Sequence, residues 1–372
     1  MEIRFLHLLL GLILPYTLSA TEIPFYIGAY TNTPNPSRGI YRSTLNTGTG
    51  ALAAPMLAAE TANPSYLALT HDNKFLYAVN ETPAHTVEAF QVESNGLLTR
   101  LNAQSTGGDS PCYVSLDDTE HTVFVANYDG GSIAAFPVKA DGSLGERALL
   151  IPLSGFGLDP QERTKSRAHS IYTSAGNRFV YACDLGTDKI WSYHFDAATG
   201  NLTPNNPPFV CVPSGAGPRH LAFLPGAPFA YVVNERSMTV TALAIDKVSG
   251  ALTPFQTLSS LPKDVPASGS GSAAIRIHPN GKWLYVSNRS HASITQFTIG
   301  IDGRLAWAAN TPGVPAIPRD FAIDPSGRWL LAAGQKANLI CNYKIDPVSG
   351  QISPTPYSLT LSAPVCLLFE KP

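Results

Sequence analysis

The chain repeats a pattern of two short apolar segments separated by a turn. Residues 215–223 (Gly-Ala-Gly-Pro-Arg-His-Leu-Ala-Phe) are followed by residues 231–235 (Tyr-Val-Val-Asn-Glu), and residues 63–69 precede residues 76–81 in the same order. The segments are rich in β-branched and aromatic residues and are bounded by Gly, Pro and Asn, which is typical of β-strands joined by turns. Self-similarity at a regular spacing indicates a protein built from one repeated unit.

Seven such units follow one another, each about 50 residues long. The first strand of each unit begins at Pro64, Pro111, Ala168, Pro218, Ser272, Pro318 and Pro364. The second strand ends at Asn80, Asn127, Asp184, Asn234, Asn288 and, in the sixth unit, Gly334. A third strand of alternating residues follows, and a Gly-containing turn leads into a fourth. Four short antiparallel strands per unit predict an all-β fold, a seven-bladed β-propeller that forms one domain over residues 21–372.

The two ends of the chain share one unit. Residues 25–30 match the second strand of the repeat and residues 39–42 match the third, but the matching first strand occurs only at residues 363–369. One blade is therefore expected to combine strands from both ends. Such a closure leaves no exposed sheet edge.

Two of the segments that connect one unit to the next are longer than the others. Residues 154–166 and 261–271 are polar insertions rich in Gly and Pro, and each lies just before the first strand of a unit. Long loops on a rigid scaffold often carry function.

Composition and the N-terminal residues indicate which partners the protein can bind and the compartment in which it acts. Hydrophobic residues make up 44% of the chain, enough for a core, and the formal net charge of −2 gives no basis for binding nucleic acid or an anionic membrane surface. Residues 1–20 contain Arg4, an apolar stretch over residues 8–14 and Ala20 at their end, which is typical of a cleaved signal peptide. The stretch is too short for a membrane span, and a buried N-terminal strand is disfavoured because it lies outside the repeat. We expect export to the periplasm or the medium.

Neither cysteine nor asparagine spacing predicts a metal site. The five cysteines, at positions 112, 183, 211, 341 and 366, lie in or beside strands, and we expect isolated buried thiols, although one bridged pair remains open. The recurring Asn and Asp at positions 80, 127, 184, 234 and 288 offer oxygen ligands, but only Asp184 is charged, too little for a tight divalent site. We expect these residues to cap turns, and we expect no metal and no cofactor.

Positions that break the repeat at one face of the propeller predict the functional site. The start of each first strand lies beside the end of the second, because the two strands are antiparallel neighbours. Residues that recur in every unit are those that folding requires. Residues that differ from the equivalent positions of the other units are therefore the better candidates for function. The candidate catalytic residues are His169, Arg219, Glu235 and Arg319, and the candidate substrate-binding residues are His220, Arg289, Gln335, Asp320 and Glu81. Tyr66 and Tyr113 are expected to pack, each with a polar tip.

Residues 217–223, 231–235, 284–289 and 318–327 carry a family resemblance. Over these segments, and over nearly all of the chain after residue 20, the sequence resembles the lactonase family with a seven-bladed propeller, which includes bacterial 6-phosphogluconolactonases and, as a relative, the fungal carboxymuconate lactonising enzyme. The resemblance implies hydrolysis of a lactone, or the reverse cyclisation. Family members usually carry an acidic residue and a His where this chain has Ala274 and Arg276.

Lactone hydrolysis needs a base that activates water and positive charge near the developing oxyanion. We expect His169 or Glu235 as the base and Arg219 and Arg319 as the cations, while Arg289 and Gln335 orient substrate hydroxyls. Arg219 is expected to lie exposed in the funnel, so that its truncation would change stability little.

The expected ligand is a small lactone or sugar acid, which is non-phosphorylated if the chain is exported. We expect the protein to be a monomer that does not bind nucleic acid. Two alternatives stay open. One is a propeller that binds a sugar acid or serves as a scaffold without turnover, and the other is a lactonising cycloisomerase.

Overall fold

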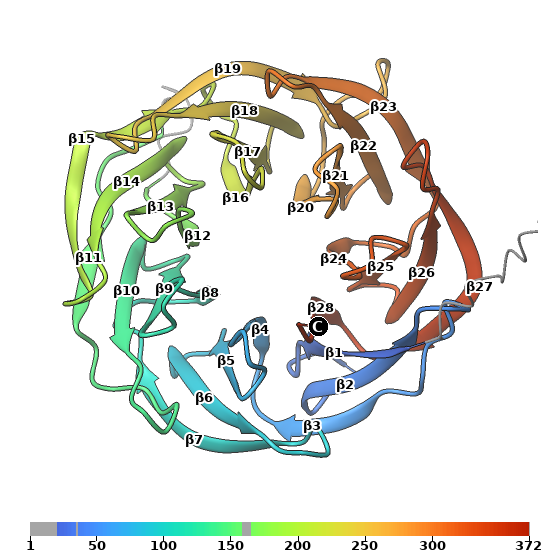
Figure 1. Cartoon of the computed structure of the whole chain (residues 1–372), viewed down its shortest axis with the longest axis horizontal. Coiled ribbons are helices and arrows are strands. Elements are labelled where there is room, and N and C mark those ends of the chain that lie inside the picture. The colour runs from blue at the N-terminus through green and yellow to red at the C-terminus, as the bar shows by residue number, and fades with distance from the viewer. Residues whose placement is uncertain (1–20, 35, 158–164, 372) are drawn as a thin grey trace, which may run out of the picture.

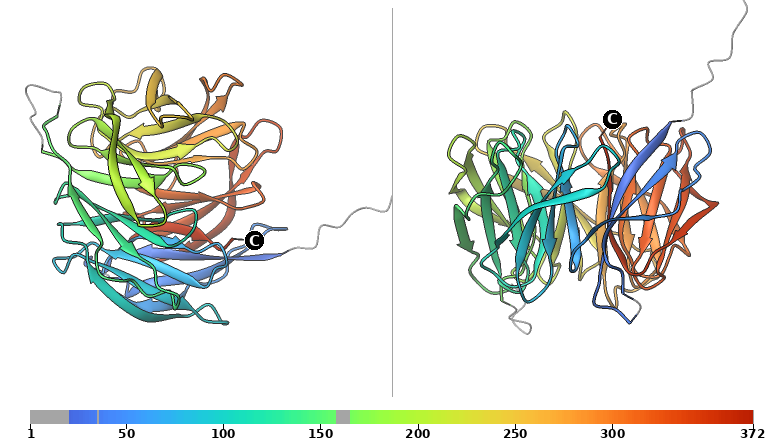
Figure 2. Two further views of the ribbon diagram at one scale, coloured as in Figure 1. Left: turned by 60° about the vertical axis from the view of Figure 1, so that its left-hand side comes forward. Right: turned by 90° about the horizontal axis from the view of Figure 1, so that it is seen from below.

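The computed structural model describes residues 21–34, 36–157 and 165–371. Seven four-stranded antiparallel sheets stand around a central axis like the blades of a propeller (Figure 1). Seen edge-on, the molecule is a disc (Figure 2, right). The expected signal peptide, residues 1–20, and residues 158–164 of the first insertion lie outside the described residues. The described part of the chain contains no helix that is both long and apolar enough to cross a membrane.

Each blade is numbered from its innermost strand outward. Blade 1 comprises β4 (Pro64–Leu69), β5 (Phe75–Asn80), β6 (Thr86–Val92) and β7 (Leu98–Ser105). Blade 2 comprises β8 (Pro111–Leu116), β9 (Thr122–Asn127), β10 (Ser132–Pro137) and β11 (Leu149–Pro152). Blade 3 comprises β12 (Ala168–Thr173), β13 (Phe179–Asp184), β14 (Lys189–Asp196) and β15 (Asn201–Cys211). Blade 4 comprises β16 (Pro218–Phe223), β17 (Phe229–Asn234), β18 (Thr239–Ile245) and β19 (Leu252–Ser259). Blade 5 comprises β20 (Ser272–Ile277), β21 (Trp283–Asn288), β22 (Ser293–Ile299) and β23 (Leu305–Pro312). Blade 6 comprises β24 (Pro318–Ile323), β25 (Trp329–Gly334), β26 (Leu339–Ile345) and β27 (Ile352–Thr360). Blade 7 comprises β28 (Pro364–Phe369), β1 (Glu22–Ala29), β2 (Gly39–Asn46), β3 (Met56–Glu60).

The predicted repeat is confirmed, including the starts of all seven innermost strands and the ends of their neighbours. The aromatic residue that leads the second strand has a structural reason to recur. Tyr77 is fully buried, and its hydroxyl donates a hydrogen bond to the carbonyl oxygen of Gly142 in the next blade at 2.9 Å. Tyr26, Tyr181, Tyr231 and Tyr285 make the same bond to a turn glycine of the following blade. These tyrosines fasten five of the seven sheets to the next sheet.

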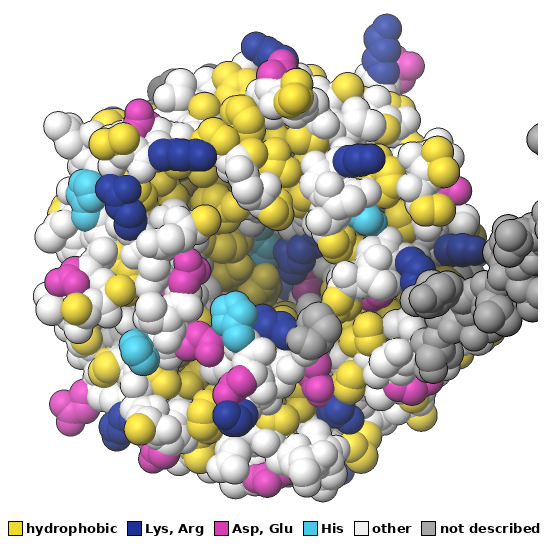
Figure 3. Space-filling model, in the orientation of Figure 1, with side chains coloured by type: hydrophobic (Ala, Val, Ile, Leu, Met, Phe, Trp, Pro, Cys, Tyr) yellow, Lys and Arg dark blue, Asp and Glu magenta, His cyan; other side chains and the backbone are white. Residues whose placement is uncertain are grey.

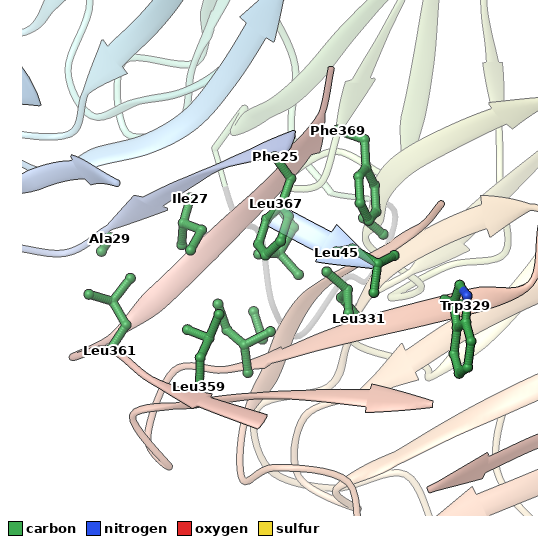
Figure 4. Packing of buried hydrophobic residues seen from close by; sticks show 13 residues of the cluster. Phe25, Ile27, Ala29, Leu45, Trp329, Leu331, Leu359, Leu361, Leu367 and Phe369 are labelled. Carbon is green, nitrogen blue, oxygen red and sulfur yellow. The ribbon is translucent and has the colours of Figure 1, made fainter. Parts of the chain in front are cut away.

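The ring closes in blade 7 as expected. β28, from the C-terminal end, pairs with β1, so that Phe25 lies opposite Phe369. Side chains of these two strands pack against the preceding blade, where Leu331 and Leu359 are buried with them (Figure 4). Pairing of the two termini removes the exposed edge that an open seven-sheet array would have.

The cysteines are free thiols, so no disulfide joins any of the five. Cys112, Cys183 and Cys366 are buried, as expected, because they lie on the two inner strands of their blades. The expectation was wrong for Cys211 and Cys341, which are partly exposed because they lie on outer strands.

Candidate functional site

One hydrogen bond recurs in all seven blades and defines the mouth of the central channel. The backbone N–H that follows the second strand donates to the carbonyl just before the innermost strand, as in Glu235 N to Gly217 O at 2.7 Å. The equivalent donors are Tyr30, Glu81, Tyr128, Leu185, Arg289 and Gln335. The predicted ring of equivalent positions is therefore confirmed, with Glu81, Glu235, Arg289 and Gln335 at one face.

A β-bulge at the start of the innermost strands explains why consecutive residues face the channel. In blade 4, Pro218 pairs with Asn234 and His220 pairs with Val233, so Arg219 has no partner in the ladder. Successive residues of a regular strand point to opposite faces, but a bulge turns an extra side chain. Arg219 and His220 consequently line the same small cavity on the axis, with Arg319 and Asp320 from the equivalent bulge of blade 6.

Glu235 joins two of the candidate arginines. Its Oε2 accepts a hydrogen bond from Nε of Arg219 at 2.9 Å and lies 2.9 Å from Nη2 of Arg289. Arg219 also donates from Nη1 to the carbonyl oxygen of Ala273, in blade 5, at 2.8 Å. The structure corrects the expectation of an exposed Arg219: only 2% of this residue is accessible, because it bridges two blades.

His169 and His220 are buried side by side at the mouth. Their ring centroids lie 5.3 Å apart, and the edge of His169 also meets Tyr128 at 5.4 Å. Burial lowers the pKa of both imidazoles well below 6.5, and the charge of Arg219 lowers each pKa further. Both rings are consequently neutral at pH 7, which leaves His169 able to accept a proton.

Arg319 and Glu81 both contact the side chain of Tyr30. The guanidinium of Arg319 is 5.4 Å from the ring centre of Tyr30, whose hydroxyl donates to Oε2 of Glu81 at 2.8 Å. Burial raises the pKa of the Tyr30 hydroxyl, so it remains a donor at neutral pH. Glu81 therefore holds the Tyr30 hydroxyl through Oε2, and Arg319 lies over the ring.

Two of the candidate substrate-binding residues differ from each other in their contacts. Asp320 is buried beneath the mouth, where Oδ1 pairs with Arg276 at 2.8 Å and Oδ2 accepts from the backbone of Leu367 at 2.9 Å. These partners hold both carboxylate oxygens. Gln335 is half-buried at the mouth, and its side chain makes no hydrogen bond to another residue in the described part of the chain.

Sequence reasoning missed Arg167 and Tyr128 as part of the site. Arg167 donates from Nη1 to the hydroxyl of Tyr128 at 3.0 Å, and its guanidinium lies 5.0 Å from the centre of that ring. The available signal was position: Arg167 directly precedes an innermost strand, and Tyr128 belongs to the ring of residues that follow the second strands.

Arginines outnumber glutamates among the described residues of the mouth. These are four arginines, at positions 167, 219, 289 and 319, and two glutamates, at positions 81 and 235. Burial lowers the pKa of the Arg289 guanidinium to about 10, against the opposing effect of Glu235. The Nε atoms of Arg167 and Arg289 are buried without a hydrogen-bond partner among the described residues. Buried donors without partners are costly, so this arrangement suits an anionic ligand.

The recurring Asn and Asp residues hold turns, as predicted. Asn80 donates to Thr61 and to the carbonyl oxygen of Ala62, and Asp184 accepts from Ser166 and Thr187. Among residues 21–34, 36–157 and 165–371, no cluster of three or more His, Cys, Asp and Glu is placed to hold a metal ion.

The chain is similar to known proteins over almost its whole length. A family model described as "Lactonase, 7-bladed beta-propeller" matches residues 24–369. The 6-phosphogluconolactonase of Bacillus subtilis is 36% identical over 348 residues, which cover 92% of this chain and 97% of the relative. The 6-phosphogluconolactonase of Formosa agariphila is 30% identical and covers 91% and 96%. The solved structure of the periplasmic gluconolactonase of Pseudomonas aeruginosa superposes with a TM-score of 0.87 at 30% identity, covering 94% of this chain and 99% of that one.

Proposed function

The chain belongs to the family of lactonases with a seven-bladed β-propeller, and from this premise we propose that it hydrolyses a sugar lactone at the mouth of its central channel. The observation that carries the proposal is the pair of guanidinium groups held by Glu235. Arg219 and Arg289 both bind Oε2, which fixes two cations side by side. Such a pair stabilises both the oxyanion that forms during lactone opening and the carboxylate of the product.

His169 is the proposed base. Its neutral imidazole takes a proton from water, and the oxygen of that water attacks the lactone carbonyl carbon. The carbonyl oxygen becomes an oxyanion beside Arg219 and Arg289, the bond from the carbonyl carbon to the ring oxygen breaks, and the leaving oxygen takes the proton. Glu235 is a weaker candidate for this role, because its Oε2 already accepts from two guanidinium groups.

The proposed substrate is a six-carbon aldonic acid lactone such as glucono-δ-lactone. The names of the relatives support the sugar, since they include 6-phosphogluconolactonases and a gluconolactonase. The cationic mouth accepts the aldonate product, and Arg319 with Arg167 offers charge for a phosphorylated lactone as well. The carbohydrate hydroxyls find acceptors in Glu81 and the amide of Gln335.

The test is acid release above the spontaneous rate, measured with glucono-δ-lactone and its 6-phosphate. The wild type is expected to show a clear excess, with kcat/KM level from pH 8 to below 6.5, because the pKa of His169 lies well below that value. His169→Gln should lower kcat about 10²–10⁴-fold, the usual contribution of a general base. The matched control is His121→Gln, an exposed histidine outside the mouth. No excess with either lactone would refute the hydrolase.

Ala274 favours binding without turnover as a second candidate function. The family resemblance implies an acidic residue here, whereas Ala274 is fully buried in an apolar cluster with Tyr285 and Phe321. Calorimetry separates the two candidates: binding of gluconate with no lactone turnover would favour the second, and turnover by the wild type would exclude it.

We also propose that the chain is exported and cleaved after Ala20. The composition of residues 1–20 supports this proposal, as does the word periplasmic in the name of the Pseudomonas aeruginosa relative. Mass spectrometry of the protein from a periplasmic extract should find a chain that begins at Thr21. Recovery of the full-length chain from the cytosol alone would contradict export.

A further inference from the structure

A cavity lies at the end of the central channel opposite the mouth. Its volume is about 690 Å³, within the range of small-molecule sites. It opens on the face where the innermost strands end, which is the face that Figure 3 shows, hollowed at its centre and walled largely by hydrophobic side chains. We call it the rear cavity.

Small side chains create the rear cavity. Tyr66 and His220 face the channel next to the bulges of their innermost strands. Two residues further along the innermost strands, the positions that face the channel include Ala68, Ser115, Ala222 and Ala322. A tightly filled channel would carry larger residues at these positions, as it does at Tyr172. The four small residues come from four different blades, so they leave a continuous space on the axis.

A layer of packed side chains separates the rear cavity from the mouth. Tyr66 stacks on Tyr113 with ring centroids 4.1 Å apart and meets the edge of His220 at 5.6 Å. Among the described residues, Tyr66 alone lines both the rear cavity and the small cavity beneath the mouth. The two spaces are therefore separate sites, and what the rear cavity holds does not depend on the proposed lactonase activity.

The rear cavity presents a cation whose counterion lies behind it. Arg276 lines the cavity with 27% of its side chain exposed, while its partner Asp320 is only 2% exposed and does not line it. The other carboxylate oxygen of Asp320 accepts from the backbone N–H of Leu367. A ligand in the cavity consequently meets the guanidinium and not the carboxylate, which favours an acceptor with negative charge.

Aromatic side chains and occupied carboxylates complete the chemistry. Tyr66, Tyr113, Tyr172 and Phe223 form part of the wall and offer rings for stacking. At the rim, Asp117 accepts from the backbone of Thr122 at 2.7 Å. Glu120 is likewise held by His71 at 2.6 Å. The third acid of the lining, Asp118, is exposed and accepts from the backbone N–H of Gly176 at 3.1 Å, so each of the three carboxylates bonds to the protein.

We propose that the rear cavity is a second ligand site, which binds an aromatic monocarboxylate of one or two rings with its carboxylate on Arg276. The apolar and aromatic wall takes the rings, and the exposed side of the guanidinium takes the charge. No covalent step is involved.

Calorimetry with 2-naphthoate as the probe tests this site. The wild type should bind one equivalent, and Ala222→Phe, which fills the cavity, should weaken binding at least tenfold while leaving lactone turnover unchanged. Ala68→Phe, from another blade, serves the same purpose if Ala222→Phe does not fold. The mouth variant Arg289→Gln should leave naphthoate binding unchanged. The neutral isostere 2-naphthamide should bind at least tenfold more weakly than 2-naphthoate.

Three results would overturn the proposal. The first is no saturable binding of 2-naphthoate at millimolar concentration. The second is binding that Arg289→Gln abolishes and both filling variants preserve, which would place the ligand at the mouth. The third is equal affinity for 2-naphthamide, which would remove the role of Arg276.

Discussion

At the scale of single residues, burial decides how the charged and titratable groups of the mouth behave. His169 and His220 are 6% and 2% exposed and lie near Arg219, so their protonation is opposed both by lost hydration and by charge. Arg219 is equally buried, and its guanidinium donates hydrogen bonds to Glu235 and to a backbone carbonyl oxygen. The same site therefore holds neutral bases beside permanent cations.

The two histidines predict acid sensitivity. Their pKa values are lower in the folded than in the unfolded chain, so the unfolded chain binds more protons below about pH 6.5. Stability is unaffected by these groups above that pH and falls as the pH drops below it, by up to about 1.4 kcal/mol per pH unit for each histidine. Urea unfolding between pH 7.5 and 5 measures this slope. His220→Gln should reduce it, whereas His121→Gln, at an exposed position, should not.

Arg219 predicts a coupled loss of stability and activity. Arg219→Ala removes the bond to Ala273 of the next blade and one partner of Glu235, so unfolding free energy should fall by about 1–3 kcal/mol. The kcat per folded molecule should fall about 10²–10³-fold if the guanidinium holds the oxyanion. Arg219→Lys should restore only part of the unfolding free energy and of kcat, because the Lys ammonium lacks the planar, two-pronged donor geometry of a guanidinium. A loss of stability with unchanged kcat would make Arg219 a clamp between blades alone.

At the scale of the strand, the bulge and the turn before it position the site. The residue just before the innermost strand has a positive φ in six of the seven blades, and in blade 5 it is Gly271, with φ of +74°. A Cβ at Gly271 would lie 2.1 Å from the carbonyl oxygen of Glu235, a contact that no relaxation of a side chain relieves. The close approach of this backbone to Glu235 is therefore a condition for the arginine pair.

Gly271→Ala tests that condition, and the chain offers a matched control. Gly226 has the same φ of +74°, but a Cβ there has no neighbour within 4 Å. Gly226→Ala should cost only the conformational strain, about 1 kcal/mol, and leave kcat unchanged. Gly271→Ala should lower the Tm further and reduce kcat at least tenfold, because Glu235 must move. Equal behaviour of the two variants in thermal unfolding and turnover would show that the backbone contact does not position Glu235.

At the scale of the whole molecule, stability depends on closing the ring. β28 pairs with β1 and also contributes Leu367 and Phe369 to the cluster shared with blade 6. Without it, β1 would become the innermost strand of its blade and an exposed edge on the channel. Both ends of the chain are thus needed for one core.

Truncation after Ala363 should prevent cooperative folding. The deletion removes a strand with Val365, Cys366 and Leu367 from the interior, and each buried apolar side chain contributes roughly 1.5–3 kcal/mol. Near-ultraviolet circular dichroism and the thermal transition measure the outcome. The control is a chain that begins at Thr21, which keeps every described strand and should retain the Tm. A truncated chain with a wild-type transition would contradict the role of ring closure.

The sequence by itself determined the blades, because the repeat is local. Short strands, glycine turns and capping asparagines are encoded within each unit, and the seven starts at Pro64 and its equivalents follow from that pattern. It also indicated the face on which Glu235 and Arg289 meet. Only the tertiary structure decided burial and partnership. The bulge that brings Arg219 and His220 to one cavity, the bond from Arg219 to Ala273 and the pairing of Asp320 with Arg276 join different strands and blades. A local pattern carries no information on such distances, since they arise when seven independent units close into a ring.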